Sequence, residues 1–487
     1  MLDFDRQVLL SIAVAILLVL GSFFSATLGI LIGSAYVVWL MWRCDAKFLP
    51  AILIISLRPS DFQLQDYGSM DYTIREVASS YVFIAGFPLT INLVMGCMIP
   101  LRVCFELFHD PDNFRSRIGN GIFIMWLLAM IPSLIMSYLG WREGNNGWTD
   151  PVRSSFIVGS YFYGLIMART WPRKGNFFLK YFMPIMLGLF VIKFSLGFHH
   201  RLLWIFAAMM PALSVHLWQF RNPHIKVLSL VNLVTATLFC FGLLGNSMTF
   251  TLVGLYTASL VMGIVSFSNF GSLSEFLKWL WGWPAIITIL VFMAFVNFKF
   301  DDYYNPGAQS ETVFEKFRAK VFDDRANLWI SSYRSIAQGH PVIEPAGRPW
   351  IFHHQKQGEI YVTFGSHNTI IDQLRKNRYF SGVIILWIMF FAVYKASIVL
   401  RKSPVPELKV LAITAIATGT VGVVTGHYPL GQNAGFWFLV FAGIAVGVFQ
   451  NVKFYEKMIM SNFRRGLVPG QVARKSVART LSSHTPR

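Results

Sequence analysis

Long apolar stretches recur along this sequence and constrain its fold more than any other feature. Most of them are roughly 17 to 25 residues long, the length of an α-helix that crosses the hydrocarbon core of a bilayer. The hydrocarbon core offers no hydrogen-bond partner to an unpaired peptide N–H or C=O, so such stretches must form helices rather than open sheets. The sequence therefore predicts an all-α protein, a polytopic transmembrane helical bundle of about 14 spans.

The predicted spans fall into two groups around one long hydrophilic segment. Eleven lie in residues 1–297 and three in residues 379–450, with the hydrophilic segment at 298–378 and a basic tail at 451–487. The third span is unusually short. The spans cover residues 8–24, 26–42, 48–57, 79–104, 119–138, 152–171, 181–198, 202–219, 226–245, 248–267, 279–298, 379–399, 408–427 and 433–450.

Composition also indicates lipid as the main solvent, because 55% of the 487 residues are hydrophobic and only 14% are charged. The formal net charge of +18 would suit a nucleic-acid-binding protein, but no compact basic module is present, and we expect no nucleic acid partner. The first apolar stretch lacks a small-residue cleavage site, so we predict a retained first span.

Basic residues are concentrated in alternate loops, a distribution typical of cytoplasmic loops. The tail after the last span carries eight Lys or Arg residues against Glu456. Both termini are therefore predicted to be cytoplasmic and the segment 298–378 to lie outside. The basic residues of the predicted cytoplasmic loops are Arg43, Lys47, Arg115, Arg117, Arg173, Lys174, Lys180, Arg221, Lys226, Lys278, Arg401, Lys402 and Lys409.

The long outer segment contains residues that start and stop helices, which indicates an ordered, mostly helical lid rather than a linker. We predict a first helix over 310–321 and a second one after the Asp323–Asp324 pair, which can cap it. Gly339 and Pro341 stop that second helix. A third helix begins near Ser366 and runs into the next span.

Charges inside the predicted spans are few. All 24 acidic residues lie in loops or at predicted interfaces, which disfavours a proton- or sodium-coupled carrier but leaves a flippase or passive channel open. Lys193 in the seventh span and Arg201 at the outer start of the eighth either snorkel to the outer face or line a cavity that binds an anionic headgroup such as pyrophosphate. His353 and His354 lack a third ligand at a suitable spacing, so no metal site is predicted.

Two pairs of residues in the outer segment and one at the start of a span form a recognisable set. Arg325 and Trp329 lie four residues apart in the second loop helix, and His367 precedes Asn368 at the start of the third. A further set of positions accompanies them: Gly339, His340, Pro341, Gly347, Gly382, His200 and Arg201.

This set resembles the O-antigen polymerase and O-antigen ligase superfamily of bacterial glycan assembly. That family has an Arg-x-x-x-Trp helix, a Pro-then-Gly turn and a His-Asn pair in a large periplasmic loop, and a Ser-Arg segment at the outer start of a span. The resemblance covers roughly residues 190–450. His200 stands where the family has Ser, and the turn from Pro341 to Gly347 departs from the family's Pro-x-x-Gly-x-Gly pattern.

The resemblance implies a GT-C-like, metal-independent glycosyltransferase of the bacterial inner membrane that needs no cofactor. Its donor would be a glycan on undecaprenyl pyrophosphate, its acceptor the hydroxyl of a second glycan or of lipid A core, and its partners possible flippase and chain-length regulator proteins. Arg325, Arg201 and Lys193 would bind the pyrophosphate, whose charge develops as the bond breaks. His367, near a helix start that disfavours imidazolium, would act as the base. Trp329, Asn368 and His200 would support them.

Three functions remain open on the sequence. Polymerase and ligase share the donor and differ in acceptor, and we favour polymerase over ligase by a slim margin. A lipid-linked glycan flippase or other transporter is the alternative from another class. It predicts essential residues spread along a central path rather than gathered at Arg201, Arg325 and His367.

Overall fold

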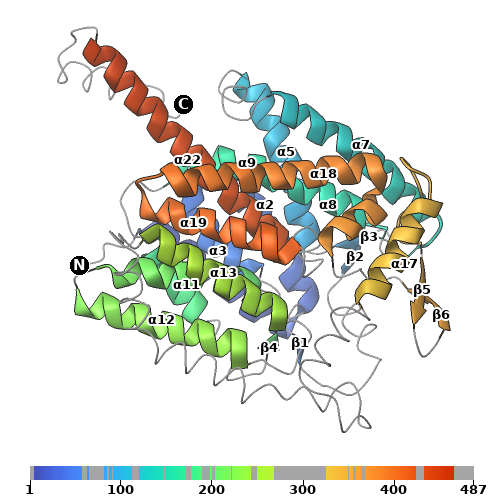
Figure 1. The fold of residues 1–487 in the computed structure, drawn as a ribbon, viewed down its shortest axis with the longest axis horizontal. Helices are drawn as coiled ribbons and strands as arrows, with labels where there is room; N and C mark the ends of the chain where they lie inside the picture. The colour runs from blue at the N-terminus through green and yellow to red at the C-terminus, as the bar shows by residue number, and fades with distance from the viewer. Residues whose placement is uncertain are drawn as a thin grey trace.

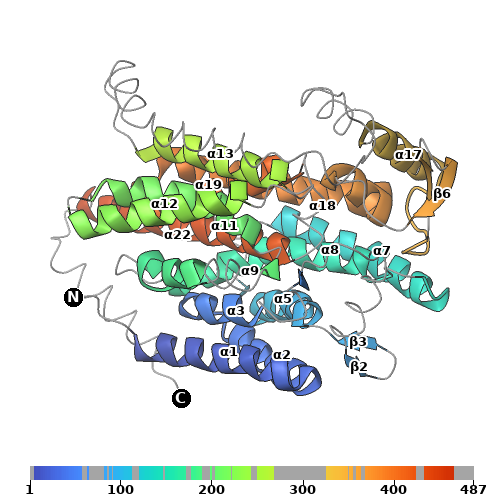
Figure 2. The same ribbon diagram turned by 90° about the horizontal axis from the view of Figure 1, so that it is seen from below.

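The fold is known from a computed structural model, in which long helices run side by side through the body of the chain (Figure 1). Seen from below, the helices are stacked in successive layers, with α1 and α2 forming an outermost layer (Figure 2). The structure describes residues 5–56, 63–64, 82–84, 87–89, 91–111, 120–145, 148–171, 177–188, 198–199, 203–220, 222–242, 249–267, 325–348, 350–354, 358–362, 368–423 and 433–464.

Helices account for most of the described chain, which confirms the predicted helical fold class. Polar caps start some of them: the Asp5 carboxylate accepts the Gln7 N–H at 2.8 Å ahead of the first helix. The α-helices are α1 Arg6–Phe24, α2 Ala26–Arg43, α3 Leu49–Ile55, α5 Ile91–His109, α7 Asn120–Arg142, α8 Asp150–Val158, α9 Ser160–Met167, α11 Leu203–Trp218, α12 Pro223–Gly242, α13 Thr249–Phe267, α17 Arg325–Gln338, α18 Thr369–Lys402, α19 Pro406–Ala417 and α22 Asn433–Arg464. Short 3-10 or π segments are η1 Ala46–Phe48, η3 Ala168–Thr170, η4 Phe178–Phe182 and η6 Thr418–Gly422.

Two described helices, Gly121–Arg142 and Thr369–Lys402, are long and apolar enough to cross a membrane by length and composition. Seven more helical segments in the described ranges are apolar but shorter. The number of spans therefore stays a prediction, as does the predicted span 279–298, which lies outside the described residues.

Short antiparallel strands are an addition that the all-α prediction missed. In the segment that the sequence predicts to lie outside, β5 Trp350–His354 pairs with β6 Gly358–Val362, with Trp350 opposite Val362. Alternating aromatic and β-branched residues explain this hairpin. The other pairs are β1 Gln63–Leu64 with β4 Phe198–His199 and β2 Val82–Ile84 with β3 Phe87–Leu89.

Two predicted spans differ from the structure. The span predicted at 79–104 is helical only from Ile91, because its first part forms β2 and β3; Pro88 lacks an N–H and opposes helix there. The short third span is the helix α3, whose seven residues are all buried. At 1.5 Å per residue α3 is roughly 10 Å long, about a third of a hydrocarbon core.

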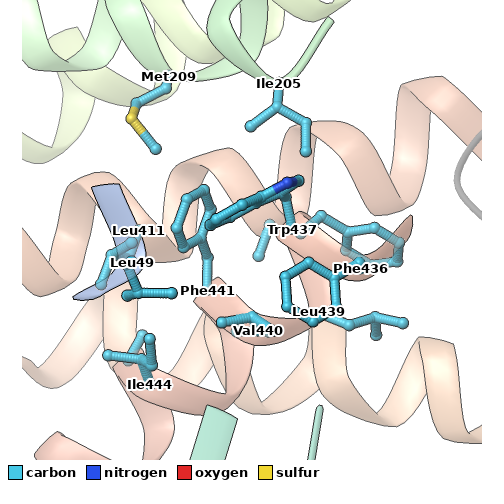
Figure 3. Close-up of a cluster of buried hydrophobic side chains, with 14 of the residues drawn as sticks. Leu49, Ile205, Met209, Leu411, Phe436, Trp437, Leu439, Val440, Phe441 and Ile444 are labelled. Atoms are coloured by element: carbon cyan, nitrogen blue, oxygen red, sulfur yellow. The ribbon is translucent and has the colours of Figure 1, made fainter. Parts of the chain in front are cut away.

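The core centres on the first half of α22, whose residues 435–447 are all buried. Figure 3 shows Trp437 and Phe441 of α22 near Ile205 and Met209 of α11, with Leu411 of α19 beside them. Trp437 is fully buried. Aromatic rings of this size contribute much of the buried apolar area in such a core.

The contact between α9 and α22 depends on two glycines that face each other. A Cβ atom on Gly443 would lie 2.9 Å from the Cα of Gly164, and one on Gly164 would meet the Val440 carbonyl. Gly443 and Gly447 are four residues apart, the spacing by which small residues let two helix backbones approach within a membrane.

The bundle has two distinct ends. At one, α7 ends and α18 begins, and the two helices are joined by the Ser381 hydroxyl, which donates to the Ala129 carbonyl at 3.0 Å. We call this the lid end, because the segment 325–348 lies there (Figure 1). We call the opposite end, where α18 finishes at Lys402 and α22 continues beyond the other helices, the tail end (Figure 1).

Candidate functional site

The helix α18 is sharply kinked at Arg378, at the lid end. Arg378 has φ 55° and ψ −178°, in the left-handed half of the map, which is strained for a residue with a side chain. A Cβ on Gly382 would lie only 2.8 Å from the Gln373 carbonyl oxygen. These residues would be about 13 Å apart along a straight helix, so the chain turns back on itself here. The kink therefore falls at the predicted boundary between outer segment and span.

The kink fastens the 325–348 segment to α18. The Tyr379 N–H, which the kink releases from its helix, donates to the Pro341 carbonyl at 3.0 Å. The Arg378 guanidinium forms an ion pair with Glu344 and donates to the Ser335 carbonyl at 3.5 Å. A Cβ on Gly339 would lie against both members of that ion pair, so any larger residue there would displace these two side chains.

Five further charges accompany Arg378 and Glu344 at or beside the kink. Lys376 pairs with Asp150 of α8 at 2.6 Å, and Arg375 lies 3.8 Å from Asp372. We call this set the junction: Asp150, Arg153, Glu344, Asp372, Arg375, Lys376 and Arg378. It holds four cations and three carboxylates, and Asp372 and Arg375 are almost completely buried.

The electrostatics of the junction favour ionised carboxylates. Burial raises the pKa of Asp150, but Lys376, Arg153 and Arg375 together lower it below its usual value. The Asp150 carboxylate is consequently charged at neutral pH. One net positive charge remains in the junction, held where solvent screens it weakly.

A polar seam and a second ion pair support the junction. Asn377 donates to Gln373 at 2.8 Å and accepts from the Ser133 hydroxyl of α7 at 3.2 Å. Arg348 forms two hydrogen bonds to Glu143, at 2.6 and 3.0 Å, and lowers the pKa of that exposed carboxyl. The far end of the 325–348 segment is thus attached to α7.

The predicted residues that the structure describes lie on the two helices that the junction joins. Asn368 caps α18, accepting the Ile370 and Ile371 N–H groups at 3.0 and 3.3 Å. This confirms the predicted third loop helix, which starts within three residues of Ser366. Arg325 is the first residue of α17 and Trp329 is partly buried on it, and α17 ends at Gln338 as predicted.

The remaining predicted residues lie outside the described part of the chain. These are Lys193, His200, Arg201, His367 and the predicted helix 310–321, together with the side chain of Arg325. The helix α11 starts two residues after Arg201 and finishes at the tail end, where Gln219 donates to the Phe267 carbonyl.

Sequence reasoning missed the junction itself. Arg375, Lys376 and Arg378 lie directly before a long apolar stretch, where the sequence predicts a helix that runs into the next span but no partners for these charges. Their signal was the density of charge just before that stretch. Gly339, Gly347 and Gly382 carried a second signal: two allow close approaches at the kink, and Gly347 has φ 76°.

Glu106, which the prediction places at the interface that follows the span 79–104, is buried among the helices. It lies within α5 and is buried, with both carboxylate oxygens paired, one to Arg102 at 2.8 Å and one to Arg169. The prediction placed the helix end at 104, whereas α5 continues to His109.

Chemically, the lid end combines guanidinium groups, an ordered helix start and a backbone held under strain. Strained residues of this kind concentrate at sites that must hold a defined geometry. In the described residues, no group of three His, Cys, Asp or Glu side chains is placed to hold a metal ion. The sequence matches no protein-family model and no curated protein.

Proposed function

We propose that the chain is a polytopic inner-membrane glycosyltransferase that moves a glycan from undecaprenyl pyrophosphate to a sugar hydroxyl at the lid end. In this proposal the bundle has about 14 spans, the lid end faces the periplasm and the tail end the cytoplasm. Polymerisation of a polysaccharide is the favoured reaction, and ligation to lipid A core differs from it only in acceptor.

The surface of the described helices supports a bilayer as the surrounding solvent. The exposed side chains of α7 and α18 are large and apolar along most of each helix, which is unusual for a protein in water. Exposed aromatic residues occur near both ends of the described bundle, as in the interfacial belts of membrane proteins, and Trp387 and Phe390 of α18 are exposed between them. Exposed aromatics at the lid end are Tyr138, Trp141, Tyr379 and Phe380, and at the tail end Trp39, Trp42, Phe105, Phe108, Trp218 and Tyr394.

The spacing of charges along one helical rod supports the same orientation. Asp150 at the lid end and Arg169 at the tail end are joined through α8, α9 and η3, and after Arg153 no charged residue occurs before Arg169. The sixteen positions from Arg153 to Arg169 span about 24 Å of helix, most of the roughly 30 Å thickness of a hydrocarbon core. Among the described residues, the tail end also holds Arg43, Lys47, Arg401, Lys402 and Lys409 of the predicted cytoplasmic loops.

The observation that carries the catalytic proposal is the junction, which ties the helix that starts with Arg325 to the helix that starts after His367. The contact joins Ser335 to Arg378, ten residues along the chain from Arg325 and from Asn368 respectively. Both starts are therefore within about 15 Å of helix from one fixed contact. This supports placing both residues over one substrate.

Within this proposal each residue has a chemical role. Arg325, with Arg201 and Lys193, binds the pyrophosphate and stabilises the charge that develops on it as its bond to the anomeric carbon breaks. His367 accepts the proton of the attacking hydroxyl. Asn368 fixes the helix start behind His367, and Trp329 and His200 support the neighbouring arginines.

Alanine substitution of Arg201, Arg325 and His367 in cells tests the proposal. Each variant, once shown to be expressed and membrane-inserted, is expected to lose normal glycan length or attachment. Normal glycan in all three contradicts the transferase assignment. The null strain separates the two acceptors on the same gel: single repeats on lipid A core indicate a lost polymerase, and polymer left on its lipid carrier indicates a lost ligase.

A transporter is the second candidate, and the buried Glu106 favours it, because buried carboxylates commonly bind or relay coupling ions. Its two oxygens are already taken by Arg102 and Arg169, which suits a fixed structural group better than an ion site. Glu106→Gln separates the candidates. A transporter predicts loss of coupled substrate movement in a stable protein, whereas the transferase predicts reduced stability with normal turnover per folded molecule.

A further inference from the structure

An exposed aromatic surface lies at the tail end, on the two neighbouring helices α2 and α5. Trp39 and Trp42 of α2 and Phe105 and Phe108 of α5 form it, and we call these four residues the aromatic strip. Each side chain is at least 40% exposed, and Phe108 is 83% exposed. The ring centroids of Trp42 and Phe105 are 4.9 Å apart, so the strip is continuous between the helices.

Cations lie directly over this aromatic strip. The Arg43 guanidinium is 4.8 Å from the centre of the Trp39 ring. The Arg102 guanidinium is 5.2 Å from the Phe105 ring and 5.9 Å from the Trp42 ring. Contacts of this kind hold a guanidinium at a fixed height over an apolar surface.

Two hydrogen bonds fix the position of the Arg102 guanidinium. Its Nη1 donates to Glu106 at 2.8 Å and its Nε to the Trp42 carbonyl at 2.9 Å. Glu106 is itself held by Arg169 from η3. The aromatic strip therefore rests on a rigid, buried charge cluster rather than on mobile side chains.

The charges around the aromatic strip leave one cation without a carboxylate. Lys47 pairs with Asp45 at 3.4 Å, and Arg102 and Arg169 share Glu106, with Asp110 3.9 Å from Arg169. Within the described residues Arg43 forms no ion pair, and four cations face three carboxylates. The surface is apolar toward the bundle centre and positively charged at its edge.

We propose that the aromatic strip binds an anionic glycerophospholipid, with its phosphate at Arg43 and an acyl chain along Trp39, Trp42 and Phe105. This rests on the membrane location proposed above. An amphipathic ligand with a negative head matches the surface, because the aromatic rings cover the apolar part and Arg43 the charge. A zwitterionic lipid offers no net charge to Arg43.

Native mass spectrometry of the purified full chain, stripped of lipid in detergent, tests the proposal. Phosphatidylglycerol is expected to remain bound where phosphatidylethanolamine dissociates. Arg43→Gln is expected to weaken phosphatidylglycerol binding about fivefold, the factor expected for one basic residue at an anionic surface. Trp39→Leu, which removes the ring beneath Arg43, should weaken it as well.

Arg401→Gln is the matched control, since Arg401 is also exposed at the tail end but lies on α18, where its Nε donates to the Ser397 carbonyl at 3.4 Å. Equal retention of both lipids, equal weakening by Arg401→Gln, or competition by inorganic phosphate alone would overturn the proposal. So would a dimer that Arg43→Gln dissociates, because the strip would then be a protein interface. Glycan transfer by Arg43→Gln should be unchanged, so a failed transferase assignment would be recognised separately at His367.

Discussion

The most specific prediction from the junction is that Glu344→Gln releases the 325–348 segment from α18. Glu344 and Arg378 are 20% and 9% exposed. Removing one partner of a fully buried ion pair costs about 3 to 5 kcal/mol. Glu344 is partly exposed and Gln keeps an oxygen that accepts from Arg378, so we expect about 2 kcal/mol, or roughly a 30-fold increase in the opened population.

The strain at Arg378 acts in the same direction. Its backbone conformation costs about 1 to 3 kcal/mol and persists only while its surroundings hold it. Loss of the ion pair should therefore also loosen the hydrogen bond from the Tyr379 N–H to the Pro341 carbonyl.

Hydrogen–deuterium exchange of the intact protein in detergent measures this opening. Faster exchange is expected in α17 and at Tyr379, with α11, α13 and α22 unchanged. Glu143→Gln is the matched control, because it removes the exposed pair with Arg348 on the same segment, and we expect little change from it. The reasoning is refuted if the two variants behave alike, or if Glu344→Gln accelerates exchange throughout the bundle.

Three further substitutions test separate parts of the structure. Gly443→Leu should overpack α9 against α22, reduce the free energy of unfolding by about 1 to 3 kcal/mol or more and so lower the thermal midpoint. Gly21→Leu is the control, because nothing lies within 4 Å of its Cβ position, and it should leave the midpoint unchanged. Equal midpoints of the two variants would contradict the close approach of α9 and α22. The folded pKa of Asp150 lies below its ordinary value, so its stabilisation is present above the unfolded pKa of about 3.9 and is lost as pH falls through the folded value. Asp150→Asn should therefore flatten the acid limb of a stability–pH curve, and an unchanged limb would refute this. Asn368→Ala should reduce the stability of α18 by about 1 kcal/mol, speed hydrogen–deuterium exchange at its first turn and reduce glycan transfer. Asn368→Asp should preserve the cap. Equal effects of the two substitutions would count against the capping role.

The helical parts of the fold were predictable because the length of each apolar stretch and the residues that start or stop a helix determine them. The stop at Gly339, the start near Ser366 and the boundary at residue 378 all correspond to features of the structure. The hairpin β5–β6 was missed because a short run of alternating residues is ambiguous when it interrupts a mainly helical sequence. The helix α3 was misjudged because burial on all sides, like lipid, favours an entirely apolar sequence.

The junction was less predictable, since it depends on contacts between residues far apart in the chain. Asp150 and Lys376 are 226 positions apart, and no local pattern links them. The left-handed conformation of Arg378 is equally hidden, because arginine has no preference for it. The glycines carry the accessible signal, because Gly339 and Gly382 belong to the motif positions and the structure shows a close approach at each of them.

The transfer reaction itself gives the most direct test of the proposed function. Purified protein would be mixed with a synthetic undecaprenyl-pyrophosphate-linked glycan and a glycan acceptor, in the presence of a metal chelator, and the released undecaprenyl pyrophosphate measured. We predict release and an elongated or attached glycan with the unaltered chain, and neither with His367→Ala nor Arg325→Ala. The proposal would be contradicted if both variants released undecaprenyl pyrophosphate at the rate of the unaltered chain. It would also be contradicted if the folded, unaltered chain released none with either a second glycan or lipid A core as the acceptor.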